Sequence, residues 1–307
     1  MKRRTFILFI SATSLFSCTP STENERTEEV QTDSVEVHIS EGYELHKVTN
    51  HAATLVLYPG GGTSSIETKQ EFDILKKSEE SNISVLLMNF SNHLWISERD
   101  CQNLTNELEG AFEEYDLNRD KIYIGGMSVG GTVAASLSNY LITTSSPLAP
   151  QGVFIVDSPV DLYALYQSAE KDILREDFSE ERLAEPRFIM NYFEEEFGTG
   201  DSLLLNIAEI SPFTYSQGSN SVSALSDTKL RFYTEPDSTW WRENRDTDYE
   251  NTNSYVIQQI AGQLESAGWE KCELIETEGK GYRANGDRHP HSWSIVDVDG
   301  LIEWMME

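Results

Sequence analysis

Apolar and polar residues follow two spacings along the chain, and these alternate from about residue 35 onward. Short, nearly continuous apolar runs are typical of strands that are buried on both faces of a sheet. Such a run covers residues 53–58, and further strands are expected at 83–88, 122–124, 152–156, 229–233 and 271–277. Residues 35–39 and 43–48 instead alternate with period two, which predicts an opening hairpin.

Segments with helical character separate the strand-like runs. They cover residues 66–77, 97–115, 253–267 and 294–306, together with a stretch of small and apolar residues that follows Gly131. Alternating strands and helices predict a mostly parallel sheet with right-handed crossovers. The segment at about 158–228 is too long for a simple crossover and contains helical pieces at 162–174 and 187–197. We interpret it as a helical cap inserted into the sheet domain.

One short stretch carries a chemical signal. Gly126, Ser128 and Gly130 have the G-x-S-x-G spacing of a nucleophile elbow, and they stand between a predicted strand and a predicted helix. Glycines on either side of the serine allow the strand and the helix to pass close to each other, so that the hydroxyl projects from the end of the sheet. The helix N-terminus behind Ser128 supplies free backbone N–H groups that suit a developing oxyanion.

With this motif and this element order, residues 35–307 resemble an α/β-hydrolase-fold serine esterase. Residues 116–131, which contain the turn, strand and elbow, are most similar to the feruloyl-esterase and esterase D-like branches. The resemblance implies a mostly parallel central sheet with helices on both faces and a helical cap. It also implies a catalytic serine, acid and histidine in that chain order.

The resemblance places the acid after the strand that follows the cap. Asp237 lies in the loop beyond that strand and is the expected residue, with Glu235 as the alternative. The histidine is expected directly before the last helix, which favours His291 over His289 because His289 precedes a proline. In this arrangement His291 accepts the Ser128 proton while Asp237 orients the imidazole.

The oxyanion formed during acyl transfer needs backbone donors. We expect one from Val129, directly after the serine, and one from Gly61 or Gly62 in the glycine-rich loop after strand 53–58. The sequence therefore predicts a carboxylesterase that cleaves a small or carbohydrate-linked ester through an acyl-enzyme on Ser128. A serine peptidase or amidase of the same fold, and a non-catalytic surface binding lipoprotein, are the alternatives.

The N-terminus resembles an export signal. Residues 1–17 have a basic head and an apolar middle too short to span a membrane, and residues 15–18 resemble the lipobox of a bacterial lipoprotein. This implies lipidation of Cys18 and anchoring to a membrane of the cell envelope. Residues 18–34 are rich in serine, threonine and glutamate, and we expect an unstructured acidic tether.

Composition narrows the partners further. The chain has 52 acidic residues against 23 lysines and arginines, a net charge of −29, which argues against a nucleic-acid partner because phosphates would be repelled. Cys101 and Cys272 fall on a predicted helix and a distant strand, so two free thiols are favoured over a disulfide. We expect neither a metal nor an organic cofactor, and the expected partner is a small-molecule ester.

Overall fold

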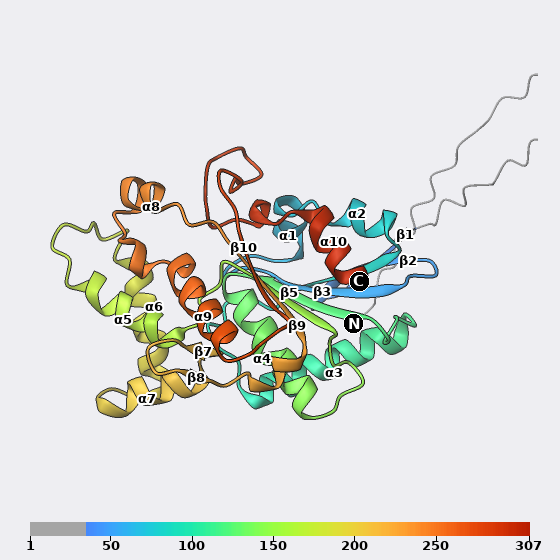
Figure 1. The fold of residues 1–307 in the computed structure, drawn as a ribbon, viewed down its shortest axis with the longest axis horizontal. Coiled ribbons are helices and arrows are strands. Elements are labelled where there is room, and N and C mark those ends of the chain that lie inside the picture. Colours follow the sequence, from blue (N-terminus) through green and yellow to red (C-terminus); the bar gives the residue numbers. More distant parts are fainter. Residues whose placement is uncertain (1–34) are drawn as a thin grey trace, which may run out of the picture.

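The computed structural model describes residues 35–307, and an eight-stranded sheet forms their centre (Figure 1). The strand order is β1-β2-β4-β3-β5-β6-β9-β10, and β2 alone runs against the others. The strands are β1 Val35–Ile39, β2 Tyr43–Val48, β3 Ala53–Tyr58, β4 Ile83–Met88, β5 Ile122–Met127, β6 Gly152–Val156, β9 Lys229–Thr234 and β10 Cys272–Glu276. Each predicted strand is confirmed to within a few residues at its ends.

Helices cover both faces of the sheet. Figure 1 shows α1, α2 and α10 on one face and α3, α4 and α9 on the other. The helices are α1 Ser65–Glu71, α2 Leu75–Glu80, α3 Glu98–Glu114, α4 Val129–Thr143, α5 Leu162–Ile173, α6 Ala184–Phe197, α7 Asp201–Ile210, α8 Ser238–Arg245, α9 Asn253–Ser266 and α10 Val298–Met306. Between β6 and β9 the chain forms α5, α6, α7 and the small pair β7 Phe213–Thr214 and β8 Ser219–Asn220, all grouped near one end of the sheet.

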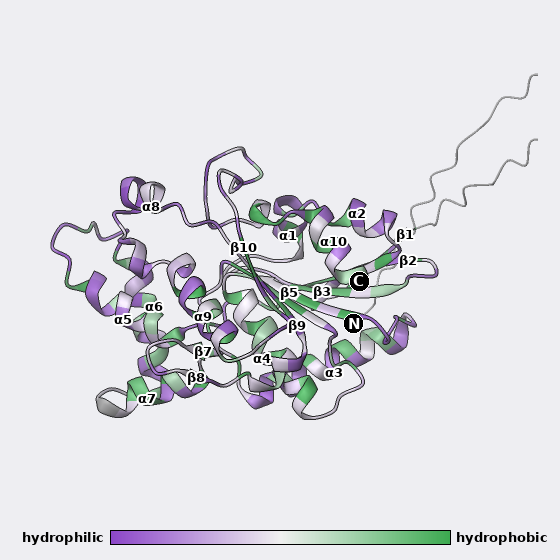
Figure 2. Cartoon of the chain, viewed as in Figure 1, coloured by the Kyte–Doolittle hydropathy of each residue, from purple (hydrophilic) through white to green (hydrophobic). Residues whose placement is uncertain are grey.

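The core consists of two large apolar clusters, one on each face of the sheet. Successive strand residues point to opposite faces, so that Phe232 belongs to the cluster under α4 and α9 while Tyr233 belongs to the cluster under α1 and α10. The apolar colouring of the central strands in Figure 2 shows the same arrangement. Burial on both faces explains the nearly continuous apolar strand sequences.

The structure corrects two helix predictions. The helix expected at 66–77 is broken, because Phe72 adopts an extended conformation and both Phe72 and Ile74 are buried. Phe72 stacks on Trp293 with ring centroids 4.6 Å apart, so tertiary packing overrides the local helical pattern. The last helix begins at Val298 rather than 294, and a short 3₁₀ turn over Trp293–Ile295 precedes it.

Several other expectations concern the termini and the cysteines. The expected signal at 1–17, Cys18 and the tether at 18–34 lie outside the described residues. Within residues 35–307, no helix is both long enough and apolar enough to cross a bilayer. Cys101 and Cys272 are both free thiols, as expected, and burial raises the pKa of each to about 12.

Candidate functional site

Ser128 occupies a strained turn between β5 and α4. Its φ of 54° lies in the left-handed region that a residue with a side chain rarely adopts. β5, the strand before Ser128, lies in the middle of the sheet between β3 and β6. The Ser128 N–H donates to Val156 O at 3.0 Å. The turn therefore presents the Ser128 side chain at the carboxyl end of the sheet, as the elbow motif predicts.

Two glycines make this turn possible. A Cβ on Gly126 would lie 2.1 Å from Gly130 O, and a Cβ on Gly130 would lie 2.4 Å from the carbonyl oxygens of Tyr58 and Pro59. The obstacles are backbone atoms in both cases, so they cannot move aside as a flexible side chain could. The G-x-S-x-G spacing is therefore explained by close approach of backbone to backbone.

His291 pairs with a carboxylate that the sequence analysis did not select. His291 Nδ1 lies 2.7 Å from Asp157 Oδ2, and the Asp157 side chain is 2% exposed while that of His291 is 20% exposed. A hydrogen bond on Nδ1 leaves Nε2 as the nitrogen available to another group. Asp157 follows β6 directly, and its N–H donates to Tyr233 O at 2.8 Å.

The other carboxylate oxygen of Asp157 is also held. Asp157 Oδ1 lies 2.7 Å from Thr234 Oγ1 and 3.3 Å from Ser254 Oγ. Asn253 Nδ2 donates to the Asp157 backbone carbonyl at 2.9 Å. Neighbouring elements β9 and α9 thus fix the carboxylate in position and satisfy its oxygens, which suits a buried negative charge beside an imidazole.

The two carboxylates predicted after β9 have other partners, so the prediction for Asp237 must be corrected. Asp237 caps α8 by accepting from Trp240 N at 2.9 Å, and it also accepts from Arg288 Nη2 at 2.7 Å. Glu235 is 1% exposed and forms an ion pair with Arg288. Neither carboxylate contacts His291.

Glu235 nevertheless serves the same loop. Its Oε2 accepts from Lys280 N at 2.8 Å and Gly281 N at 3.0 Å, and from Thr277 Oγ1 at 3.0 Å. These residues begin the segment that leads from β10 to His291. Glu235 therefore anchors this segment to the end of β9.

The glycine-rich loop after β3 lies beside the serine turn. A Cβ on Gly60 would be 3.8 Å from Ser128 Cβ, and one on Gly61 would be 3.6 Å from Val129 Cγ2. Gly62 N donates to Asn92 Oδ1 at 2.8 Å, which removes Gly62 from the two candidate oxyanion donors. Gly61 is left, and among residues 35–307 its N–H has no hydrogen-bond partner. Val129 is the first residue of α4, where an N–H has no intrahelical acceptor.

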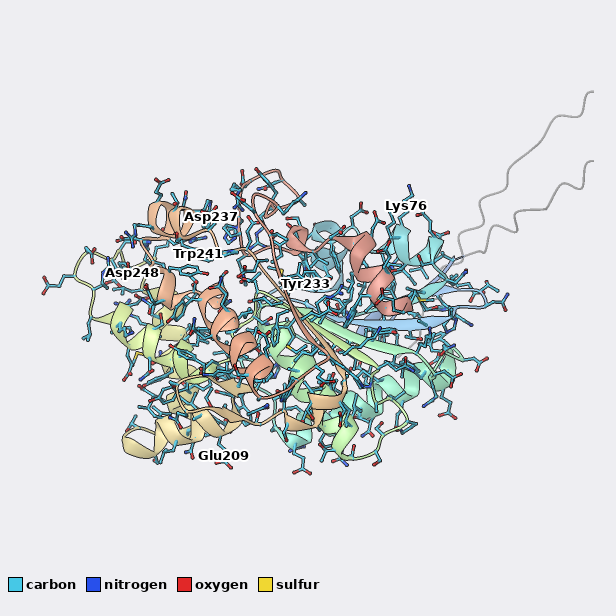
Figure 3. All side chains as sticks on the ribbon, viewed as in Figure 1. Lys76, Glu209, Tyr233, Asp237, Trp241 and Asp248 are labelled. Carbon is cyan, nitrogen blue, oxygen red and sulfur yellow. The ribbon has the colours of Figure 1, made fainter. Side chains whose placement is uncertain are left out.

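One cavity of about 650 Å³ connects these groups. Ser128, Val129, Gly60, Gly61 and His291 all line it. Its other walls come from α5, α6 and α8 and from the loop before the last helix; they include Leu165, Phe188, Ile189, Trp241, Arg283 and Trp293. Figure 3 shows Trp241 on the side of α8 that faces the body of the molecule. The volume of the cavity suits a small organic substrate.

His289 also lines the cavity, in a different environment from His291. Its ring lies 4.6 Å from the Trp240 ring and 6.2 Å from the His291 ring, measured between centroids. Burial, together with the positive charges of Arg283 and Arg245, lowers the pKa of His289 to about 3. His289 is therefore neutral at neutral pH, and no carboxylate is hydrogen-bonded to its ring among residues 35–307.

The sequence did contain a signal for Asp157. It is an aspartate placed directly after a fully apolar strand, next to the strand that carries the serine. The carboxyl ends of adjacent parallel strands meet at one edge of the sheet, where sites of α/β proteins form. The resemblance placed the acid after the strand that follows the cap, and so it pointed away from the end of β6, where Asp157 lies.

Comparisons with known proteins support the fold. No family model matches the chain, and no curated protein matches it by sequence. Among solved structures, it is similar to carboxyl esterase 2 of the fungus Tuber melanosporum, with a TM-score of 0.53 and 12% identity over 92% of this chain and 87% of that one. It is also similar to an esterase of Rhizomucor miehei, with a TM-score of 0.52 and 15% identity over 89% of this chain and 82% of that one. With the sheet order above, these similarities show an α/β-hydrolase fold.

Proposed function

We propose that this protein is a serine hydrolase that cleaves carboxylic esters, with Ser128 as nucleophile, His291 as base and Asp157 as the acid. The observation that carries the proposal is the 2.7 Å contact between His291 and Asp157 in a loop that lines the same cavity as the strained Ser128 turn. Serine, acid and histidine occur in the expected chain order, with Asp157 in place of Asp237.

The chemistry follows from these positions. His291 Nε2 removes the Ser128 proton as Oγ attacks the carbonyl carbon, and the developing oxyanion is stabilised by the N–H groups of Gly61 and Val129. His291 then returns the proton to the leaving alcohol, which breaks the ester bond and leaves an acyl group on Ser128. Water activated by His291 releases the acid and restores the serine. Asp157 holds the imidazole in the correct tautomer and stabilises its charged form.

The substrate we propose is a small or carbohydrate-linked ester, as the sequence analysis suggested. In support, the cavity is of modest volume, and its walls mix apolar side chains such as Leu165 and Ile189 with polar ones such as Asn251 and Asn253. The segment at 158–228 supplies several of these walls, consistent with the cap that we infer for it.

Turnover of p-nitrophenyl acetate and butyrate tests the proposal. The full-length chain should hydrolyse both esters, and Ser128→Ala and His291→Ala should each reduce kcat by about 10⁴-fold or more, because triad members act as a unit. A fluorophosphonate probe should label the parent chain and not Ser128→Ala. Equal background rates in all three proteins, without labelling, would move the assignment to a non-catalytic binding protein.

We further propose that Cys18 carries the lipid that anchors this enzyme to a membrane of the cell envelope. The support is the basic and apolar segment before Cys18 in the sequence. Incorporation of labelled palmitate into the full-length chain, and its loss in Cys18→Ala, is the expected result. Labelling of Cys18→Ala to the same level would exclude this anchor.

A further inference from the structure

Two arginines lie on the wall of the cavity that also contains the histidines. Arg245 is the last residue of α8, and Arg283 lies in the segment between β10 and His291. Both line the cavity, and both lie close enough to His289 for their charges to lower its pKa. They also act on each other, since Arg245 contributes to the lowered pKa of Arg283.

Neither arginine has an ion pair within residues 35–307. Six other arginines of the described chain do: Arg175 and Arg182 pair with Asp246, Arg187 with Glu180, Arg231 with Glu273, Arg242 with Asp248, and Arg288 with Glu235 and Asp237. Arg99 and Arg119 also have no ion pair within residues 35–307, but neither of them lines the cavity. In a chain with 52 acidic and 23 basic residues, a surface arginine has many potential partners. Two that face a cavity without an ion pair are therefore candidates for binding a ligand.

Arg283 is half-buried, and this burial is the main reason for its lowered pKa. The negative charge of Glu71 raises the pKa of Arg283 and so opposes the lowering by burial. Glu71 forms no ion pair with Arg283; its Oε2 accepts from Ala284 N at 3.0 Å. A partly desolvated guanidinium beside a second positive charge is unfavourable. An anion bound between Arg245 and Arg283 would relieve both the desolvation and the repulsion.

The remaining charges of the cavity favour the same position. Its carboxylates come from other elements: Glu67 and Glu71 from α1, and Asp172, Glu181 and Glu185 from α5, α6 and the turn between them. Burial raises the pKa of Asp172, and Arg175 and Arg182 oppose this rise. Of these carboxylates, Glu71 alone acts on the pKa of Arg283, so two guanidinium groups face one nearby carboxylate and this part of the cavity favours an anionic group.

We propose that Arg245 and Arg283 bind an anionic oxygen group of the substrate, so that the enzyme prefers esters whose acid or alcohol part carries a carboxylate or a similar oxyanion. This inference rests on the proposed esterase function. Guanidinium groups present parallel N–H donors that match the two oxygens of such a group. The group would lie in the same cavity as Ser128 and His291.

Matched esters that differ in charge test the preference. The substrates are 4-acetoxybenzoate, 4-acetoxybenzenesulfonate and the neutral methyl 4-acetoxybenzoate, with the p-nitrophenyl monoester of glutaric acid and p-nitrophenyl pentanoate as the acid-side pair. Arg283→Gln should lower kcat/KM for the charged member of at least one pair by roughly 10-fold to 100-fold, as expected for losing a charge-assisted hydrogen bond. It should leave the neutral esters nearly unchanged. Dividing parent by variant for each ester cancels differences in intrinsic reactivity.

Arg242→Gln is the matched control. Arg242 lies one turn earlier on α8, is exposed, pairs with Asp248 at 3.4 Å and does not line the cavity. Arg242→Gln changes the net charge by the same amount as Arg283→Gln, so a general electrostatic effect would appear in both variants. Arg245→Gln should resemble Arg283→Gln and differ from Arg242→Gln. The sulfonate and carboxylate esters separate the two kinds of oxyanion.

Calorimetry separates failure of this inference from failure of the proposed function. In the Ser128→Ala background, 4-acetoxybenzoate should bind, and adding Arg283→Gln should weaken its binding by roughly 10-fold or more. Suppose that neutral esters are turned over in a Ser128-dependent way, but Arg283→Gln affects the charged and neutral members of both pairs equally. This result would overturn the anion site and leave the proposed function standing. If no ester is turned over, the proposed function fails, and equal binding to the two Ser128→Ala proteins would then overturn the anion site as well.

Discussion

Thr234 Oγ1 lies 2.7 Å from Asp157 Oδ1, the oxygen that His291 does not contact. The hydroxyl comes from the last residue of β9 and the carboxylate from the residue that follows β6. The register of these strands pairs Val156 with Tyr233, so Asp157 and Thr234 come together at the edge of the sheet. This contact fixes the rotation of the carboxylate that faces the imidazole.

Removing the Thr234 hydroxyl should therefore slow catalysis without changing the turn that presents Ser128. Thr234→Val keeps the shape of the side chain but loses a hydrogen bond to a buried charge, a change of about 1.5 to 3 kcal/mol. We expect kcat for p-nitrophenyl butyrate to fall by roughly 10-fold to 100-fold. Thr234→Ser should recover most of the rate, because the hydroxyl is restored. A Thr234→Val enzyme with the parent kcat would show that the contact does not contribute.

The choice between two carboxylates can be tested directly. Asp157→Asn should reduce kcat by about 10⁴-fold, since an amide beside His291 Nδ1 favours the wrong tautomer. Asp237→Asn should change kcat by less than about 10-fold, because Asp237 contacts Arg288 and caps α8. Steady-state kinetics on the two variants gives the answer, and a reversed order of effects would restore Asp237 as the acid.

Glu235 should matter for stability. It is buried and paired with Arg288, so Glu235→Gln leaves a less well compensated charge and should lower the free energy of unfolding by about 3 kcal/mol. Glu273→Gln is the control, because the Glu273 side chain is 46% exposed and its pair with Arg231 should contribute no more than about 1 kcal/mol. Urea denaturation measures both. Similar losses in the two variants would mean that burial of Glu235 has no special effect.

His289 makes stability depend on pH. Its pKa in the folded protein is lowered to about 3, whereas an unperturbed histidine has a pKa of about 6.5. Between these values the unfolded chain binds more protons, so this contribution to stability is present above about pH 6.5 and is lost as the pH falls toward 3. His289→Asn lacks the group and should lose less stability than the parent chain between pH 6.5 and 4.5. Parallel pH dependence of the melting temperature in both proteins would contradict this expectation.

How much the sequence determined differs between elements. The strand, turn and helix around Ser128 were predictable because the elbow is local: three residues at fixed spacing explain the backbone contacts at Gly126 and Gly130. The position of His291 before the last helix was predictable from chain order. The break between α1 and α2 was not, because Phe72 leaves the helix to stack on Trp293, more than 200 residues later in the chain.

The partner of His291 was decided by the tertiary structure alone. The ends of β6 and β9 are neighbours in the sheet, only about 5 Å apart, and each carries carboxylates in the sequence. Which of them meets the imidazole depends on the path of the segment from β10 to His291. Glu235 binds the start of this segment and Arg288 ties its far part to Glu235 and Asp237, so both carboxylates after β9 are engaged and Asp157 is left to face His291. Local sequence determined the turn at Ser128 and the succession of strands and helices along the chain, whereas contacts between distant segments determined which carboxylate faces His291.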